Sequence, residues 1–376
     1  MPNIKNNIPK QPLRVLVVDD TILYRTLISE VLTAIPDVEV VGTAAHGEIA
    51  LAKIAELAPD LITLDVEMPV MDGLTTLKRL QNLKTKVVVV MVSAHTIQGA
   101  AITLEALRLG AYDFITKPDG DDPQKNLEML AGKFRPIIHA VMTQKILRQT
   151  IDGMPPANLD QFIKPKVATP PAPGITAQST AHPGGRIEIV AIGISTGGPN
   201  ALADLLPRLP ADFPVPIVIV QHMPKLFTGT LAESLDSKCA IRVMEGESGQ
   251  PLEAGTAYIA PGGRQMRIAG GQGQSTYYLE ITDDPPENHC QPSADYLFRS
   301  IASVCRGQAL GVIMTGMGCD GTLGLRLMKR HGAQIIAQDQ ASCVVAGMPM
   351  EAMKAGIVDI VLPLSDIGAE IMRRVK

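Results

Sequence analysis

The 376-residue sequence contains no tryptophan, and aromatic residues make up only 3% of it. Proteins that bind single-stranded nucleic acid commonly stack the bases on aromatic side chains, so this composition argues against that mode of binding. The formal net charge is −4, and no run of basic residues could follow a phosphate backbone. We therefore expect no nucleic-acid partner.

Long apolar runs and paired cysteines are also missing. The aliphatic run 87–92 is far shorter than the ~20 residues that a transmembrane helix needs. The first ten residues lack the apolar core of a signal peptide. The five cysteines are odd in number and form no C-x-x-C pair: Cys239, Cys290, Cys305, Cys319 and Cys343. We expect a reduced, cytoplasmic protein with no membrane insertion and no structural zinc.

Proline is concentrated in residues 150–185, which predicts an extended tether between two folded blocks. In both blocks, short β-branched runs alternate with amphipathic segments, the pattern of parallel sheets covered on both faces. We expect a flavodoxin-like (βα)5 domain, a linker helix that continues past Pro136, and a doubly wound, Rossmann-like domain containing one hairpin. The predicted strands are 14–18, 38–43, 61–64, 87–91 and 112–115, then 187–194, 217–220, 257–259, 311–314 and 334–337, with the hairpin at 265–281.

The segment 187–199 reads IEIVAIGISTGGP, which predicts a buried strand, a tight glycine turn and a helix opening at Pro199. Such a turn places Ser195 beside a helix N-terminus, where backbone N–H groups can hold an oxyanion. Glycine-rich turns of this kind also cradle phosphates or merely turn the chain. The spacing of Gly193, Ser195 and Gly197 fits the G-x-S-x-G elbow of α/β-hydrolases, whereas no dinucleotide-binding G-x-G-x-x-G is present.

A serine nucleophile needs a base and an acid that orients the base. His222 follows the predicted strand 217–220, and Asp320 lies in the glycine-rich MTGMGCDGTLG that follows strand 311–314. Three strand ends thus offer Ser, His and Asp at one edge of one sheet. The chain order differs from the Ser, acid, His order of α/β-hydrolases, which argues against the elbow interpretation.

Polar residues also follow the strands of the first block. Asp19 and Asp20 end the first strand, Asp65 ends the third, Ser93 follows the fourth and Lys117 follows the fifth. Binding sites of doubly wound sheets gather at these carboxyl ends. Clustered carboxylates suit Mg²⁺, while a hydroxyl and an ammonium group could contact a phosphoryl group carried by one of them.

Residues 12–135 resemble the receiver domain of bacterial two-component response regulators. The matching stretches are LVVDD, LDVEMPVMDG, MVSAHT and DFITKP. The resemblance implies a phospho-acceptor at Asp65 and an acid pocket for Mg²⁺ made by Asp19, Asp20 and Asp65. It assigns the switch hydroxyl, the switch aromatic and the lysine of the receiver to Ser93, Phe114 and Lys117.

A second resemblance covers residues 187–365, within an expected domain of 186–376 that follows the linker 136–185. The motifs GISTGGP, QHMP, YIAPGG, QPSADYLFRS, TGMGCDG and CVVAGMP look like the catalytic domain of chemotaxis-type protein-glutamate methylesterases, the CheB family. The resemblance implies Ser195 as nucleophile, His222 as base and Asp320 as orienting acid. It places the oxyanion hole at the N–H groups of Thr196 and Met317, and lets Thr196 help to position His222.

The same resemblance implies the biological setting. The expected reaction is hydrolysis of glutamyl methyl esters on methyl-accepting chemoreceptors, with deamidation of glutamines by the same route and no metal in the catalytic domain. A histidine kinase of the CheA type is the expected phosphate source. The unphosphorylated receiver is expected to cover the catalytic cleft.

Several positions depart from the family pattern and leave the substrate open. The segment before Pro292 usually contains a histidine and a basic residue, and here it reads Asn288, His289, Cys290 and Gln291. Gly229, Ala346 and Met350 replace an arginine, an aromatic and a basic residue. A binding protein whose catalytic site is no longer used therefore stays an alternative. A response regulator with a DNA-binding output is disfavoured by the charge and by the Ser/His/Asp set.

Overall fold

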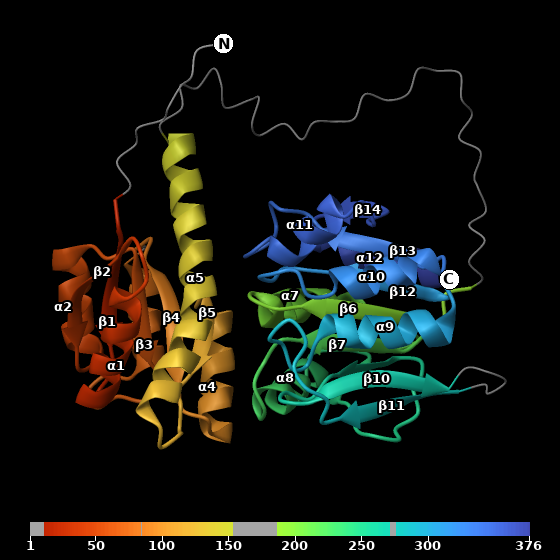
Figure 1. Ribbon diagram of the computed structural model, residues 1–376, viewed down its shortest axis with the longest axis horizontal. Helices are drawn as coiled ribbons and strands as arrows, with labels where there is room; N and C mark the ends of the chain where they lie inside the picture. The colour runs from red at the N-terminus through yellow and green to blue at the C-terminus, as the bar shows by residue number, and fades with distance from the viewer. Residues whose placement is uncertain (1–10, 84, 153–185, 271–275) are drawn as a thin grey trace, which may run out of the picture.

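The computed structural model describes residues 11–83, 85–152, 186–270 and 276–376, which form two α/β units lying side by side (Figure 1). Most of the predicted tether, residues 153–185, lies outside the described residues. The fold class expected from the sequence is confirmed in both units, since each is built on a parallel sheet.

The N-terminal unit has a five-stranded parallel sheet in the order β2-β1-β3-β4-β5. Alternate side chains of β1 enter different cores, Val15 and Val17 on one face and Leu16 and Val18 on the other. The strands are β1 (Leu13–Val18), β2 (Val38–Ala44), β3 (Leu61–Asp65), β4 (Val88–Ser93) and β5 (Asp113–Thr116).

Helices cover both faces of this sheet. The side chains of Thr21, Asp72 and Thr96 accept the first free backbone N–H groups of α1, α3 and α4, which fixes where these helices begin. Helix α5 runs through Pro136 without interruption and packs with α1, while α2, α3 and α4 cover the opposite face. The helices are α1 (Ile22–Thr33), α2 (Gly47–Leu57), α3 (Gly73–Asn82), α4 (Ile97–Arg108) and α5 (Pro123–Asp152).

The C-terminal unit has a seven-stranded parallel sheet in the order β14-β13-β12-β6-β7-β9-β8. The edge strands β8 and β14 were not predicted, because they are short and only partly buried. The strands are β6 (Ile189–Ile194), β7 (Ile217–Gln221), β8 (Arg242–Glu245), β9 (Thr256–Ile259), β12 (Ala309–Ile313), β13 (Gln334–Gln338) and β14 (Ile360–Leu362).

Helices α7, α8 and α12 pack on one face of this sheet, and α9, α10 and α11 on the other together with the predicted hairpin. The helices are α7 (Gly198–Leu205) with the short η1 (Leu206–Arg208), α8 (Phe227–Asp236), α9 (Ala294–Cys305), α10 (Thr322–Arg330), α11 (Gly347–Lys354) and α12 (Leu364–Val375). The hairpin consists of β10 (Gln265–Gly270) and β11 (Tyr277–Thr282).

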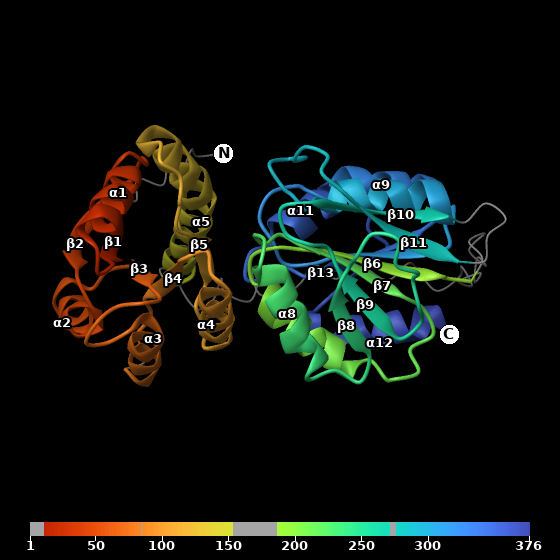
Figure 2. The same ribbon diagram turned by 90° about the horizontal axis from the view of Figure 1, so that it is seen from below.

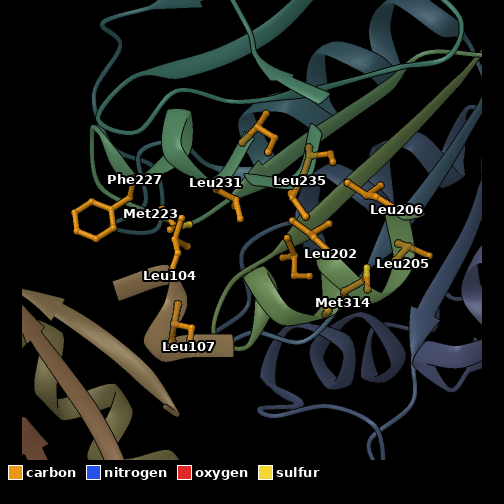
Figure 3. Packing of buried hydrophobic residues seen from close by; sticks show 14 of the residues in the cluster. Leu104, Leu107, Leu202, Leu205, Leu206, Met223, Phe227, Leu231, Leu235 and Met314 are labelled. Carbon is orange, nitrogen blue, oxygen red and sulfur yellow. The ribbon is translucent and has the colours of Figure 1, made fainter. Parts of the chain in front are cut away.

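The two units meet through α4, β5 and α5 of the first and the start of α7 and α8 of the second (Figures 1 and 2). Leu104 of α4 lies against Met223, and buried apolar side chains of both units form one continuous cluster (Figure 3). The rings of Phe114 and Phe227 stack across this contact with centroids 4.7 Å apart. Hydrogen bonds of 2.7 Å also join the units, from Asn200 to the Leu107 carbonyl and from Gln144 to the Val344 carbonyl.

Candidate active site

Ser195 is held by the turn that follows β6. Its backbone N–H donates to the Thr315 carbonyl at 3.0 Å, and its own carbonyl accepts from the Gln221 side chain at 3.0 Å. Gly197 has a φ of +78°, and a Cβ there would lie 2.7 Å from the Cβ of Val344. Only glycine fits this conformation and this space, which explains the glycine turn.

His222 follows β7, the strand next to β6. Ile194 and Gln221 are paired across these strands, and the backbone N–H of His222 donates to the Ile194 carbonyl at 3.2 Å. Ser195 directly follows Ile194 and His222 directly follows Gln221. The register of the two strands therefore brings the predicted nucleophile and base together. Among the described residues, no hydrogen bond joins the Ser195 hydroxyl to His222, a contact that in many enzymes tightens only when substrate binds.

Asp320 is positioned to orient the imidazole. Its Oδ2 lies 2.7 Å from His222 Nε2 and also accepts the Ala294 N–H at 2.7 Å. Its Oδ1 accepts from the side chains of Asn288 at 3.0 Å and Ser293 at 2.8 Å, and from the Asp295 N–H at 3.1 Å. A carboxylate that accepts so many hydrogen bonds is fixed in place and favours the ionised form.

The two ring partners shift each other's pKa in opposite directions. Burial acts to raise the pKa of Asp320, but the hydrogen bond and charge of His222 lower it below its ordinary value. Burial acts to lower the pKa of His222, but the hydrogen bonds to Asp320 and then Cys290 raise it above its ordinary value. The imidazole is therefore a stronger base than a free histidine.

The free ring nitrogen of His222 has a neighbour that sequence reasoning did not place there. Cys290 Sγ lies 3.7 Å from Nδ1. The sequence signal was the departure from the family pattern at Cys290, which indicated an altered substrate approach but not a contact with the base.

Two backbone N–H groups are free to hold an oxyanion. Neither Thr196 N–H nor Met317 N–H makes a hydrogen bond with any described residue, although both lie in the turns beside Ser195. The neighbouring Gly316 is so close to the nucleophile that a Cβ there would lie 2.8 Å from Ser195 Cβ. The two N–H groups are thus free donors near Ser195, and their role as an oxyanion hole stays a prediction.

The Thr196 side chain differs from expectation. Its hydroxyl donates to Asp113 Oδ2 of the N-terminal unit at 2.7 Å, so it is not hydrogen-bonded to His222. Burial at this contact raises the pKa of Asp113 to about 6. The expected role of Thr196 in positioning His222 is therefore not seen in this arrangement of the two units.

The N-terminal unit gathers a second set of polar side chains at the carboxyl edge of its own sheet. Carboxylate oxygens of Asp19, Asp20 and Asp65 lie within 4.8 Å of one another. Lys117 Nζ lies 2.8 Å from Asp19 Oδ2 and 2.8 Å from Asp65 Oδ2. Three hard oxygen donors at this spacing fit Mg²⁺, with Asp20 exposed to solvent.

Asp65 is buried, and burial raises its pKa to about 6 despite the opposing effect of Lys117. Ser93 is the fully buried last residue of β4, and its hydroxyl donates to the Ala94 carbonyl at 3.2 Å. Phe114 lies in β5, only a few residues before Lys117, and its ring contacts Phe227 of the other unit. One short strand thus connects the acid cluster to the contact between the units.

Comparison with known proteins gives a family for each of the two units. Residues 190–371 match the family described as CheB methylesterase, and residues 15–127 match the response regulator receiver domain. The chain is 48% identical over 364 residues to a protein-glutamate methylesterase/protein-glutamine glutaminase of Desulfotalea psychrophila, covering 97% of this chain and 99% of that one. It belongs to the CheB methylesterase family.

A second relative, from Bacillus subtilis, bears the same name and is 42% identical over 97% of this chain and 99% of its own length. Among solved structures, the Thermotoga maritima CheB methylesterase catalytic domain is 39% identical, with a TM-score of 0.48, and covers 50% of this chain and 97% of that one. The response regulator domain of Thermotoga maritima CheB is 43% identical, with a TM-score of 0.32, and covers 35% of this chain and 97% of that one.

Membership of the CheB methylesterase family makes the chain an enzyme of the carboxylic ester hydrolase class and a two-component response regulator of chemotaxis type. No helix in the described parts of the chain is long and apolar enough to cross a membrane.

Proposed function

We propose that this chain is a phosphorylation-activated protein-glutamate methylesterase that hydrolyses glutamyl methyl esters on chemoreceptors. The observation that carries the proposal is the 2.7 Å contact between His222 and a fully hydrogen-bonded Asp320, at the sheet edge that also presents Ser195. A binding protein with an abandoned site would have no need of a carboxylate so heavily constrained.

The reaction follows from the positions of these groups. His222 Nδ1 takes the Ser195 proton while Oγ attacks the ester carbonyl, and the N–H groups of Thr196 and Met317 stabilise the oxyanion. The imidazolium then gives its proton to the departing methoxide, methanol leaves, and an acyl-enzyme remains. His222 next activates a water molecule, which releases the receptor carboxylate and restores Ser195. Deamidation of glutamine follows the same steps with ammonia as the leaving group, and neither route uses a metal in the catalytic domain.

Asp65 is the proposed phospho-acceptor. Mg²⁺ held by Asp19, Asp20 and Asp65 would offset the charge of the incoming phosphoryl group. Lys117 already contacts two of these carboxylates and would pair with the phosphoryl oxygens, while Ser93 supplies a hydroxyl donor. The phosphate source is a histidine kinase of the CheA type, and the substrates are methyl-accepting receptors reached from the cytoplasm.

The proposed regulation is steric. Asp113 binds the hydroxyl of Thr196, the residue next to the nucleophile, and Phe114 covers Phe227 at the start of α8. A receiver docked in this way limits the approach of a receptor helix to Ser195. Phosphorylation of Asp65 would move β5 and weaken this contact, since Phe114 and Lys117 lie on the same strand and loop.

The test is release of methanol from receptor fragments carrying labelled methyl esters, with and without a small-molecule phosphodonor and Mg²⁺. Ser195→Ala should lower turnover by several orders of magnitude and leave the fold intact, because Ser195 has no left-handed φ that would strain alanine. Asp65→Asn should retain basal turnover and lose both the phosphoryl label and the response to phosphodonor. Near-normal turnover by Ser195→Ala, or a label that persists in Asp65→Asn, would contradict the respective assignment.

A further inference from the structure

A cysteine thiol lies beside the ring nitrogen of His222 that the proposed mechanism uses as the base. His222 Nε2 is occupied by Asp320, so Nδ1 is the nitrogen that must accept the Ser195 proton. That nitrogen faces Cys290 Sγ at 3.7 Å. The Asp320 carboxylate completes a group of three ligand atoms that all lie within 4.8 Å of one another.

The backbone fixes the thiol in this position. Glu287 and Cys290 exchange two backbone hydrogen bonds, of 3.1 Å and 2.7 Å, that close a tight turn. The two residues between them, Asn288 and His289, both have positive φ values of 52° and 61°. Asn288 also ties the turn to Asp320 through its side chain at 3.0 Å, so the thiol and the acid are held by one local structure.

The spacing fits a thiophilic metal ion. Zinc binds thiolate sulfur at ~2.3 Å and imidazole nitrogen at about 2.0–2.1 Å in tetrahedral geometry, which separates the two ligand atoms by about 3.6 Å. The observed separation of 3.7 Å needs almost no adjustment. Zinc-bound histidines also commonly donate their second ring N–H to a carboxylate, the role that Asp320 Oδ2 fills at 2.7 Å.

We propose that Cys290 Sγ and His222 Nδ1 form a binding site for Zn²⁺ or a similar thiophilic divalent ion, with Asp320 as the outer carboxylate. Two protein ligands leave two tetrahedral positions for water. Binding displaces the thiol proton and the Nδ1 proton of the imidazolium to solvent, leaves a thiolate and a neutral imidazole on the metal, and involves no oxidation. Both ligand side chains are partly exposed, with 14% of the His222 side-chain surface accessible to solvent.

The ion would inhibit the enzyme, a consequence that depends on the proposed function. A lone pair bound to metal cannot accept the Ser195 proton. The Mg²⁺ site of the receiver is chemically distinct, because its ligands are carboxylates alone. Thiophilic ions are thus expected to act at the catalytic domain, and magnesium at the receiver.

The experiment titrates the full-length protein with Co²⁺, whose bond to a thiolate gives a charge-transfer absorption band in the near ultraviolet. The band should appear in the wild type, and Cys290→Ser should remove it or weaken Co²⁺ binding by at least roughly 10–100-fold. The matched control is Cys319→Ser, which changes an exposed cysteine beside Asp320 that has no contact with His222 and should keep the band. Absence of the band, or its persistence in Cys290→Ser, would overturn the site.

Inhibition is measured separately, as the ratio of methanol release with and without Zn²⁺ for each variant. We expect strong inhibition of the wild type and of Cys319→Ser that a chelator reverses, and a much smaller ratio for Cys290→Ser. A Co²⁺ band without Zn²⁺ inhibition would retain the site and overturn the inhibitory role. A protein that releases no methanol under any condition would contradict the proposed function, while the Co²⁺ titration would still decide the metal site.

Discussion

At the scale of single residues, Asp320 acts on the proposed reaction through the protonation of His222, which it contacts. It accepts hydrogen bonds from Ala294, Asp295, Asn288 and Ser293 besides that of the imidazole. These bonds keep the carboxylate ionised and hold it in one orientation. His222 therefore has one ring nitrogen fixed as the donor and the other available as the base.

The pH profile of the esterase should report this coupling. Turnover should rise with pH as His222 loses its proton, with a midpoint above the ordinary histidine value of 6.5, because Asp320 stabilises the protonated ring. Asp320→Asn removes that stabilisation, so the midpoint should move to lower pH while the maximal rate falls by several orders of magnitude. The measurement is methanol release from labelled receptor fragments between pH 5 and 10. A lower rate with an unmoved midpoint would show that Asp320 acts only by packing.

The proposed triad residues could be selected from the sequence because each follows an apolar run at a strand end, and the structure brings two of them, His222 and Asp320, into contact. The contacts between Cys290 and His222 and between Asp113 and Thr196 could not be predicted. They join residues 68 and 83 positions apart through turns and a docking surface, for which a single sequence carries no periodic signal.

At the scale of elements, the turn that follows β12 leaves no room for a side chain at Gly316. A Cβ on Gly316 would lie 2.4 Å from Met348 Sδ and 2.8 Å from Ser195 Cβ. The absence of a side chain at Gly316 therefore lets the turn after β12 lie directly against Ser195. The strands of the sheet interior were predictable from their apolar runs, whereas β8 and β14 were missed because edge strands need fewer buried residues.

Gly316→Ala should destabilise the protein by about 1–3 kcal/mol, the usual range for overpacking, and lower esterase activity by displacing Ser195. The matched control is Gly132→Ala in α5, where nothing lies within 4 Å of the added methyl group and alanine favours the helix. Thermal unfolding and methanol release would be measured for both. Equal stability of the two variants would show that the turn can relax around a side chain.

At the scale of the whole molecule, the receiver and the catalytic domain share an apolar surface with few polar contacts. Leu104 on the receiver lies against Met223 on the other side (Figure 3). The ring of Phe114 stacks on that of Phe227. Two charged side chains lie at this surface, since Arg108 of α4 contacts the Ser234 hydroxyl of α8 and Asp113 accepts from Thr196. Burial raises the pKa of Asp113, so the ionised carboxylate resists docking. A contact between domains with this composition can separate when the position of β5 changes by a small amount.

Loosening this surface should raise basal activity. Leu104→Asp buries a charge at the contact and should increase methanol release by the unphosphorylated full-length protein toward that of a fragment beginning near Gly185. Leu83→Asp is the matched control, since Leu83 is 62% exposed at the end of α3 and should change nothing. Phosphodonor should recover part of the difference in the wild type. If the fragment is less active than the whole chain, the receiver serves recruitment instead of inhibition.

The order of the chain also decides when activity first exists during synthesis. His222 and Asp320 lie 98 positions apart, and β12 enters the sheet beside β6, a strand made much earlier. A nascent chain therefore contains Ser195 and His222 while the 98 residues up to Asp320 are still being translated, and during that time no acid orients the imidazole. The receiver, made first, can fold as a unit before the triad is complete. A product that ends before Asp320 lacks the proposed orienting acid, and a product translated from residue 1 that contains Asp320 also contains the receiver.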